Sequence, residues 1–270
     1  MTTFTRFITD CADSNASLRL GLRSEVLFGV TTQVISVGSE IEAAGQLVDA
    51  LDICAGIPGI IFVNIAPRNG DARKWGNGVP FGHFSVGLTR VVTTIGEKTL
   101  SLVAKLGLVK TVNVLDIPTV CEWALTKSLI GMDEAKDLRT TQFRSLKFAP
   151  AVGNWISNRN DVPSTETPIS DFVLPALSAE HRVWLQDCFG NLKTSRVARG
   201  LPSKIELENP RAGKLRFRER LSDVPDDGQP TWIVGSSGYG NRRFLELVVQ
   251  GGSAADVLKL KTGDKIPTRY

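Results

Sequence analysis

The feature that most constrains the fold is an unbroken apolar run at residues 59–65, GIIFVNI. A run of this length, without alternating polar residues, is typical of a strand that is buried on both faces. Such strands occur in parallel sheets, because the helices that connect parallel strands cover both sides of the sheet. The run therefore predicts an α/β domain with residues 59–65 near its centre.

The segments before this run alternate between strand and helix patterns. Residues 3–9 (TFTRFIT) and 31–37 are rich in β-branched residues and predict strands, whereas residues 18–28 and 39–53 have helical periodicity. The first strand ends at Asp10, and ligands of such sheets bind at the carboxyl ends of the strands. Asp10 is therefore a candidate ligand-binding residue, although an aspartate after a strand also commonly caps the next helix.

The composition changes at residues 158–172, which contain two prolines and few apolar side chains. Beyond them, short alternating runs are separated by turn residues, a pattern typical of an all-β module. We therefore predict three parts: an α/β domain with a Rossmann-like layered sheet at residues 1–157, a linker at residues 158–172, and an all-β barrel domain at residues 173–270.

The composition also argues against several kinds of partner and site. A net charge of +4 comes from 32 basic and 28 acidic residues that are scattered along the chain, so we expect no nucleic-acid partner. The four cysteines form no CxxC pair and only two histidines are present, so we expect no metal site. No signal sequence or run of about 20 apolar residues is present, and we expect a cytoplasmic protein with no membrane partner.

A second candidate site is the segment DCFGN at residues 187–191. It combines a carboxylate (Asp187), an aromatic ring (Phe189), a glycine and a carboxamide (Asn191), which together suit a nucleoside-sized ligand. The same residue types are also common in hairpin turns, where Asp187 and Asn191 would bond neighbouring backbone groups and Phe189 would lie in the core. The segment alone leaves both roles open.

Five short motifs occur in an order found in a known family. The chain resembles the S-adenosylmethionine (SAM) hydroxide adenosyltransferases, relatives of the fluorinating and chlorinating enzymes that attack the same substrate. The resemblance rests on ITD at residues 8–10, FAPA at 148–151, DCFGNL at 187–192, SDVP at 222–225 and FLELVVQGGSAA at 244–255.

The resemblance implies a homotrimer that binds a nucleoside between the first domain of one subunit and the second domain of its neighbour. In that frame Asp10 holds the ribose diol, Asp187 and Asn191 hold the methionine end, and Phe189 stacks on the adenine. Gly251 lets its backbone approach the edge of the base. No cofactor is implied, because SAM itself is the substrate or ligand.

The family also places a serine and an arginine near the methionine carboxylate, ahead of the FLEL strand. In this chain residues 235–243 (GSSGYGNRR) look like an insertion at that point, so the correspondence depends on the register. Arg242 is our first candidate for this role, and Ser236 is the second.

Two of the residues that activate water in the hydrolytic members are replaced in this chain. The family's DPGVGTxR loop corresponds to residues 66–73, APRNGDAR, in which Arg73 is kept but the catalytic aspartate is Ala66. The family's histidine ahead of FAPA corresponds to Phe143. Asp71, five residues after Ala66, is a candidate replacement for the lost carboxylate.

The replacements leave the activity open. Cleavage of SAM at the 5′ carbon, giving methionine and adenosine or a 5′-substituted adenosine, releases a neutral leaving group that needs no acid. Water must lose a proton as it attacks and needs a base, whereas a halide needs only desolvation and hydrogen-bond donors. The alternatives are a protein that binds an adenosyl ligand without reacting and a structural trimer.

Overall fold

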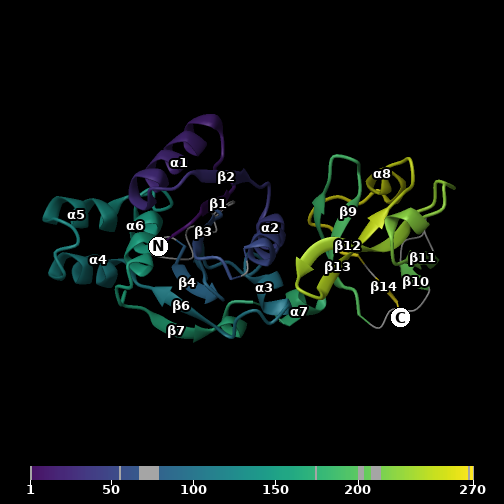
Figure 1. The fold of residues 1–270 in the computed structure, drawn as a ribbon. Helices are drawn as coiled ribbons and strands as arrows, with labels where there is room; N and C mark the ends of the chain where they lie inside the picture. The colour runs from purple at the N-terminus through teal and green to yellow at the C-terminus, as the bar shows by residue number, and fades with distance from the viewer. Residues whose placement is uncertain are drawn as a thin grey trace.

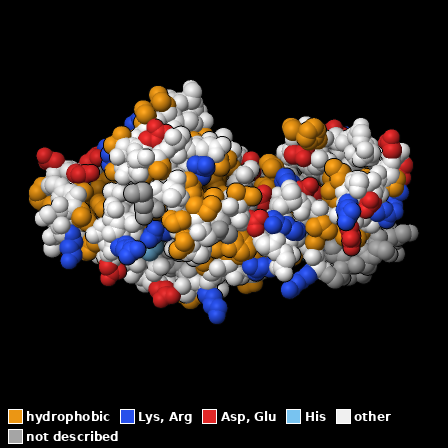
Figure 2. Space-filling model, in the orientation of Figure 1, with side chains coloured by type: hydrophobic (Ala, Val, Ile, Leu, Met, Phe, Trp, Pro, Cys, Tyr) orange, Lys and Arg blue, Asp and Glu red, His pale blue; other side chains and the backbone are white. Residues whose placement is uncertain are grey.

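The computed structural model describes residues 2–54, 56–66, 79–173, 175–199, 204–207, 214–266 and 268–269. The chain forms two regions, each built on a seven-stranded sheet, that lie side by side in Figure 1. In Figure 2, acidic and basic side chains are interspersed along the visible face rather than gathered by sign. Among the described residues, no helix is long and apolar enough to cross a membrane, and no cluster of three or more His, Cys, Asp or Glu could hold a metal ion.

The first sheet has the order β2-β1-β3-β5-β4-β6-β7. Strands β2, β1, β3 and β5 run parallel to their neighbours, and β4, β6 and β7 are added in antiparallel fashion. The apolar run forms β3, whose first five residues are buried, which confirms the predicted α/β domain. The strands are β1 (Thr5–Thr9), β2 (Thr32–Ser36), β3 (Gly59–Asn64), β4 (Phe81–Val86), β5 (Thr89–Thr94), β6 (Thr111–Leu115) and β7 (Thr165–Pro168).

Helices cover both faces of this sheet. Helices α1 and α6 pack on one face over Phe7 and Phe62, and α2 and α3 pack on the other over Ile8 and Val63. The helices are α1 (Ser14–Phe28), α2 (Glu40–Ile53), α3 (Ser101–Lys105), α4 (Ile117–Thr126), α5 (Met132–Thr140), α6 (Phe148–Ser157), α7 (Pro175–Ala179) and α8 (Ala254–Leu258), with short 3-10 turns at Ile169–Asp171 and Leu221–Asp223.

The path of the chain reverses direction across the first sheet at β1 and β3. Helix α1 leads from β1 to β2 on one face, and α2 leads from β2 to β3 on the opposite face. In open α/β sheets, this reversal leaves a crevice at the carboxyl ends of the two central strands, where ligands bind. Asp10 follows β1 and Ala66 follows β3, so both lie at this crevice.

The second sheet has the order β14-β10-β11-β12-β13-β9-β8, and the predicted closed barrel is wrong for the strands that the structure describes. Instead, residues 264–269 connect the two edges of the sheet: Lys265 forms a single bridge to Arg182 beside β8, and β14 pairs with β10. One bridge is too short to complete a ladder. The strands are β8 (Val183–Gln186), β9 (Leu192–Val197), β10 (Lys204–Leu207), β11 (Lys214–Arg218), β12 (Thr231–Tyr239), β13 (Arg242–Val248) and β14 (Thr268–Arg269).

The two sheets are joined by packing as well as by the chain. Within the residues predicted as a linker, Thr165–Pro168 form β7, which pairs with β6 at the edge of the first sheet. Trp184 of β8 and Phe244 of β13 are buried in the same cluster as the apolar residues of α2. A Cβ atom at Gly45 of α2 would lie 2.1 Å from Cε3 of Trp184, so only glycine allows this close approach. We call this contact the seam.

Candidate functional site

The carboxylate of Asp10 connects the ends of β1 and β3. Its Oδ1 atom accepts a hydrogen bond from the backbone N–H of Ala66 at 3.0 Å, and Cys11 Sγ lies 3.5 Å from the same oxygen. Asp10 is half-buried. Because the bond spans 56 positions of the sequence, the orientation of this carboxylate is set by the tertiary fold rather than by a local turn.

Neighbouring polar side chains fix the same edge of the sheet. Thr9 is fully buried, and its Oγ1 accepts bonds from the Cys11 N–H at 3.1 Å and from the Asn64 amide at 3.4 Å. Ile65 N–H donates to Thr94 Oγ1 at 3.2 Å, which connects β3 to β5. Sequence reasoning missed Asn64, although a polar residue that ends a buried strand is the same signal that identified Asp10.

The two positions at which the resembling family carries water-activating residues hold no titratable side chain here. Ala66 is half-buried beside Asp10. Phe143 is 61% exposed, and its ring centroid lies 6.0 Å from the guanidinium carbon of Arg19 on α1. The other two candidates in this loop, Asp71 and Arg73, lie outside the described residues.

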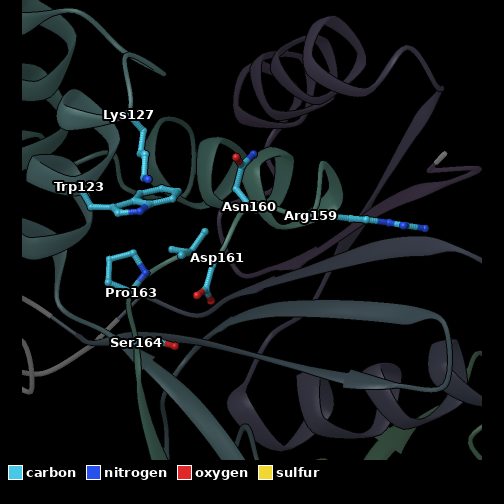
Figure 3. A pocket seen from close by; sticks show the side chains of 8 residues that line it. Trp123, Lys127, Arg159, Asn160, Asp161, Pro163 and Ser164 are labelled. Carbon is cyan, nitrogen blue, oxygen red and sulfur yellow. The ribbon is translucent and has the colours of Figure 1, made fainter.

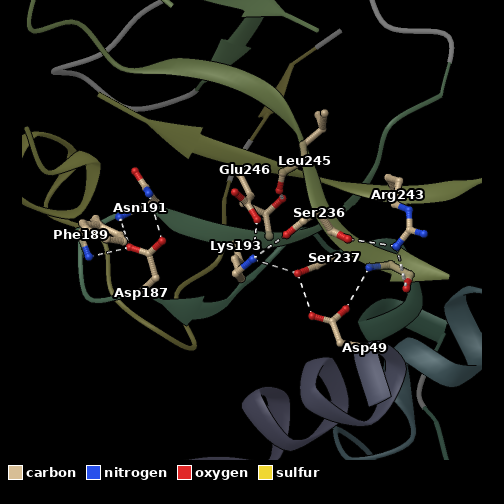
Figure 4. Close-up of polar contacts among 12 residues, drawn as sticks. Asp49, Asp187, Phe189, Asn191, Lys193, Ser236, Ser237, Arg243, Leu245 and Glu246 are labelled. Carbon is tan, nitrogen blue, oxygen red and sulfur yellow. Dashed lines mark hydrogen bonds and ion pairs between the residues drawn. The ribbon is translucent and has the colours of Figure 1, made fainter. Parts of the chain in front are cut away.

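The DCFGN segment forms a tight turn between β8 and β9 (Figure 4). Asp187 Oδ1 accepts bonds from the N–H groups of Phe189 and Asn191, both at 2.9 Å, and Oδ2 accepts from the Asn191 amide at 3.0 Å. Gly190 has φ +80°, and a Cβ there would lie 2.2 Å from Ser253 Oγ. Phe189 is 75% exposed, so its ring lies on the surface rather than in the core.

The remaining three predicted ligand residues come from β12, β13 and the turn after them. Arg242 Nη1 donates to the carbonyl of Leu106 on the first domain, whereas Ser236 Oγ lies 3.4 Å from Lys193 Nζ. Arg242 and Ser236 therefore engage different partners. Gly251 has φ +67° in the turn after β13, a conformation that favours glycine. The residues 235–243 that look like an insertion form the β12–β13 hairpin.

A polar group at the seam was not predicted from the sequence. Asp49 of α2 accepts bonds from Ser237 Oγ at 2.8 Å and from the Gly238 N–H at 3.0 Å, and Lys193 pairs with Glu246 at 2.7 Å (Figure 4). Burial raises the pKa of Asp49, while these hydrogen bonds and the charge of Lys193 partly oppose that rise. One turn further along α2, Asp52 pairs with Arg243 at 2.7 Å.

The spacing of these two aspartates was the available signal. Residues three apart on a helix share a face, so Asp49 and Asp52 mark a polar stripe on α2. Their partners belong to a hairpin more than 180 residues away, with sequence separations of 188 to 191. The sequence pattern therefore shows that a polar contact exists but not what it meets.

The seam also holds a lysine and a histidine with altered acidity. Lys105 Nζ donates to the carbonyl of Glu180 at 2.7 Å and lies 3.5 Å from Nδ1 of His181. Burial lowers the pKa of Lys105 to about 8 and that of His181 to about 4, and the charge of Arg196 contributes to both. At neutral pH His181 is therefore uncharged, which limits the positive charge that the seam must bury.

Comparison with known proteins relates this architecture to other chains. No curated protein matches. Solved structures do: a conserved hypothetical protein from Thermus thermophilus (TM-score 0.63, 17% identity, covering 99% of this chain and 100% of that one) and an uncharacterized conserved protein from Thermotoga maritima (TM-score 0.67, 15% identity, covering 98% and 100%). At these identities the likeness shows the fold alone.

A family comparison adds identity to the fold. Residues 181–267 match the family described as the SAM hydroxide adenosyltransferase C-terminal domain. The match includes β8, the DCFGN turn, the β12–β13 hairpin and α8. The chain therefore carries the C-terminal domain of the SAM hydroxide adenosyltransferase family.

Proposed function

We propose that the protein binds an adenosyl compound, SAM or adenosine, in the crevice between the carboxyl ends of β1 and β3. The observation that carries the proposal is the position of Asp10, whose carboxylate lies where the chain reverses direction across the sheet and is oriented by the Ala66 N–H. One carboxylate can accept hydrogen bonds from two vicinal hydroxyls. Asp10 therefore holds the ribose diol in this proposal.

The second half of the proposed site is the DCFGN turn of a neighbouring subunit in a homotrimer. Three hydrogen bonds to Asp187 fix the turn, yet its aromatic residue is 75% exposed. A rigid, exposed ring suits stacking on adenine, because little conformational entropy is lost when the ligand arrives. Asn191 and Asp187 face the methionine end, Arg242 and Ser236 are candidates for its carboxylate, and Gly251 approaches the base.

We further propose that any cleavage of SAM proceeds without a base at positions 66 and 143. Water attack at the 5′ carbon gives adenosine, methionine and a proton, so a base is needed to accept that proton. Asp71 is the candidate for this role, with Arg73 beside it. Halide attack gives a 5′-halo-5′-deoxyadenosine and methionine, and it releases no proton.

A second candidate function is adenosyl binding without turnover. The observation that favours it is the chemistry of positions 66 and 143, where a methyl group and an exposed phenyl ring replace titratable side chains. Both functions require the same binding contacts. A separate measurement of binding and of product formation distinguishes them.

The test is calorimetric titration of the full chain with SAM and with adenosine. We expect saturable binding, and we expect Asp10→Asn to weaken it at least tenfold, since a carboxylate that accepts two hydroxyls is lost. Asp133→Asn, at an exposed position on α5, is the matched control and should leave affinity unchanged. Absence of binding, or an equal loss in both variants, would refute the proposed site.

Product analysis then separates the two functions. The protein is incubated with SAM in the presence and absence of chloride or bromide, and adenosine and 5′-halo-adenosines are separated by chromatography. Either product, absent from controls without protein, establishes turnover. Binding without product supports the non-catalytic function. Sedimentation of the same sample measures the subunit number, and a monomer that binds with full affinity would remove the shared site from the proposal.

A further inference from the structure

A separate hollow of about 230 Å³ lies at the opposite edge of the first sheet from Asp10. Its walls come from the start of β3, the β4–β5 hairpin and the end of α6, and its lining residues are Pro58, Ser85, Gly87, Leu88, Arg90, Ser157 and Arg159. Strands β3 and β5 begin at this edge, whereas Asp10 follows the end of β1. The hollow is therefore distinct from the proposed adenosyl site.

Two arginines without an ion-pair partner among the described residues line this hollow. Arg90 is half-buried on β5, and Arg159 follows α6. The described lining residues include no aspartate or glutamate. Arg159 also borders a larger neighbouring hollow, but in Figure 3 its side chain extends away from Trp123, Lys127 and the other residues drawn there. Two guanidinium groups thus face one small space without a counter-charge from its walls.

Hydroxyl groups supply the remaining donors. Ser85 lies directly opposite Arg90 in the β4–β5 ladder, and residues paired in this way project on the same face of the sheet. Across the hollow, the Oγ of Ser157 is buried and has no hydrogen-bond partner among the described residues. A buried hydroxyl without a partner carries a desolvation cost, which an oxygen-rich ligand would relieve by accepting its hydrogen bond.

The walls of the hollow are held in place by the backbone. Thr89 is fully buried, and its Oγ1 lies 3.0 Å from the carbonyl of Cys54 and 3.1 Å from that of Ile57, which fixes the hairpin against the loop before β3. At the end of α6, the N–H of Arg159 donates to the carbonyl of Ile156. This bond occupies a carbonyl at the negative end of the helix, which would otherwise repel an anion.

We propose that this hollow is a binding site for a small tetrahedral oxyanion, either inorganic phosphate or the phosphate group of a small monoester. Arg90 and Arg159 neutralise the charge and donate through their planar guanidinium groups, which match phosphate geometry. Ser157 and Ser85 donate hydroxyl hydrogens to the remaining oxygens. The volume is below the range of about 300–1,000 Å³ that is typical of drug-sized ligands, so the site takes a small group rather than a nucleotide.

The test is calorimetric titration of the full chain with inorganic phosphate and, separately, with methyl phosphate. Ionic strength is held constant with sodium chloride, because non-specific binding to arginines would be screened equally in all samples. We expect saturable binding with one site. Tighter binding of methyl phosphate would identify a monoester as the ligand class, and tighter binding of inorganic phosphate would identify the free ion.

Substitutions at the two arginines assign the binding to this hollow. Arg90→Gln and Arg159→Asn should each weaken phosphate binding about tenfold or more, the size expected for the loss of a charge-assisted hydrogen bond. Asparagine is chosen at position 159 because its φ is +61° and asparagine tolerates this conformation. Arg139→Gln, at an exposed arginine on α5, is the matched control and should retain the affinity of the unsubstituted protein.

A measurement on the unsubstituted protein keeps the proposal testable if a variant does not fold. Phenylglyoxal modifies accessible arginines, and mass spectrometry locates the modified positions. Phosphate should protect Arg90 and Arg159 from modification and leave Arg139 reactive. The proposal is overturned if phosphate shows no saturable binding, if protection is equal at all three arginines, or if folded Arg90→Gln and Arg159→Asn proteins bind phosphate as the unsubstituted protein does.

Discussion

Asp10 and Asp187 are both half-buried aspartates that follow a strand and accept backbone hydrogen bonds, yet they are held in different ways. Asp10 accepts from Ala66, which is 56 positions away, and so connects two strands of the sheet. Asp187 accepts from Phe189 and Asn191, at most four positions away, and so closes its own turn. The first carboxylate depends on the tertiary fold, whereas the second is satisfied locally.

This difference suggests separate contributions to a shared site. The three hydrogen bonds to Asp187 come from the turn itself, so its clearest effect is to shape the backbone that presents Phe189. The sequence left open whether this segment is a hairpin turn or a ligand site, and its polar contacts are those of a turn. Phe189 differs from the hairpin expectation, because it lies on the surface and not in the core.

The largest expected effect tests how tightly the Asp187 turn is built. Gly190→Ala should lower the free energy of unfolding by about 3 kcal/mol, because the new methyl group meets Ser253 and the backbone has φ +80°. Gly107→Ala is the matched control: its φ is +57° but nothing lies within 4 Å of the added methyl group, so only about 1 kcal/mol of backbone strain is expected. Urea unfolding measures both values. Equal losses would mean that the contact with Ser253 contributes nothing.

A direct comparison of the two aspartates should give an intermediate effect. Asp187→Ala removes three hydrogen bonds and should cost about 2 kcal/mol, whereas Asp10→Ala removes one backbone hydrogen bond and should cost about 1 kcal/mol. Adenosyl affinity should show the opposite order, with the greater loss at Asp10. If Asp187→Ala proves neutral in urea unfolding, the distinction between a local and a long-range carboxylate fails.

The smallest effect on stability is expected at Phe189. Phe189→Ala should change the free energy of unfolding by no more than about 0.5 kcal/mol, because the ring is 75% exposed. If the ring stacks on adenine, adenosyl affinity should nevertheless fall about two- to tenfold. Leu221→Ala, at a position that is 54% exposed, is the control. A large loss of stability at Phe189, or equal affinities in both variants, would contradict the stacking role.

The sequence predicted elements best where the pattern is local. The buried run became β3, and Ser39 caps α2 as its capping pattern indicates. Helix α5 and strand β9 were not predicted, because α5 is polar on average and β9 mixes lysine, arginine and threonine with few apolar residues. The closed barrel was wrong because the edges of a sheet are set by pairing between distant strands, which alternation along one strand does not reveal.

The candidate site was predictable to the same extent. Asp10 follows from the rule that ligands bind at strand ends, and that rule also selects Asn64. The partners of Asp49 and Asp52 do not follow from any rule of spacing, since they depend on how the two sheets dock. The contact between Arg242 and Leu106 is likewise a product of docking, and it gives that arginine a structural partner that the motif comparison could not indicate.

The close approach of Trp184 to Gly45 has a consequence for how the molecule unfolds. Separating the two sheets would move the rings of Trp184 and Phe244 from a shared core into water, at a cost of about 2–3 kcal/mol each. It would also break the hydrogen bonds that Asp49 and Asp52 accept. We therefore expect a single cooperative unfolding transition, so a substitution in either sheet should lower the melting temperature of both.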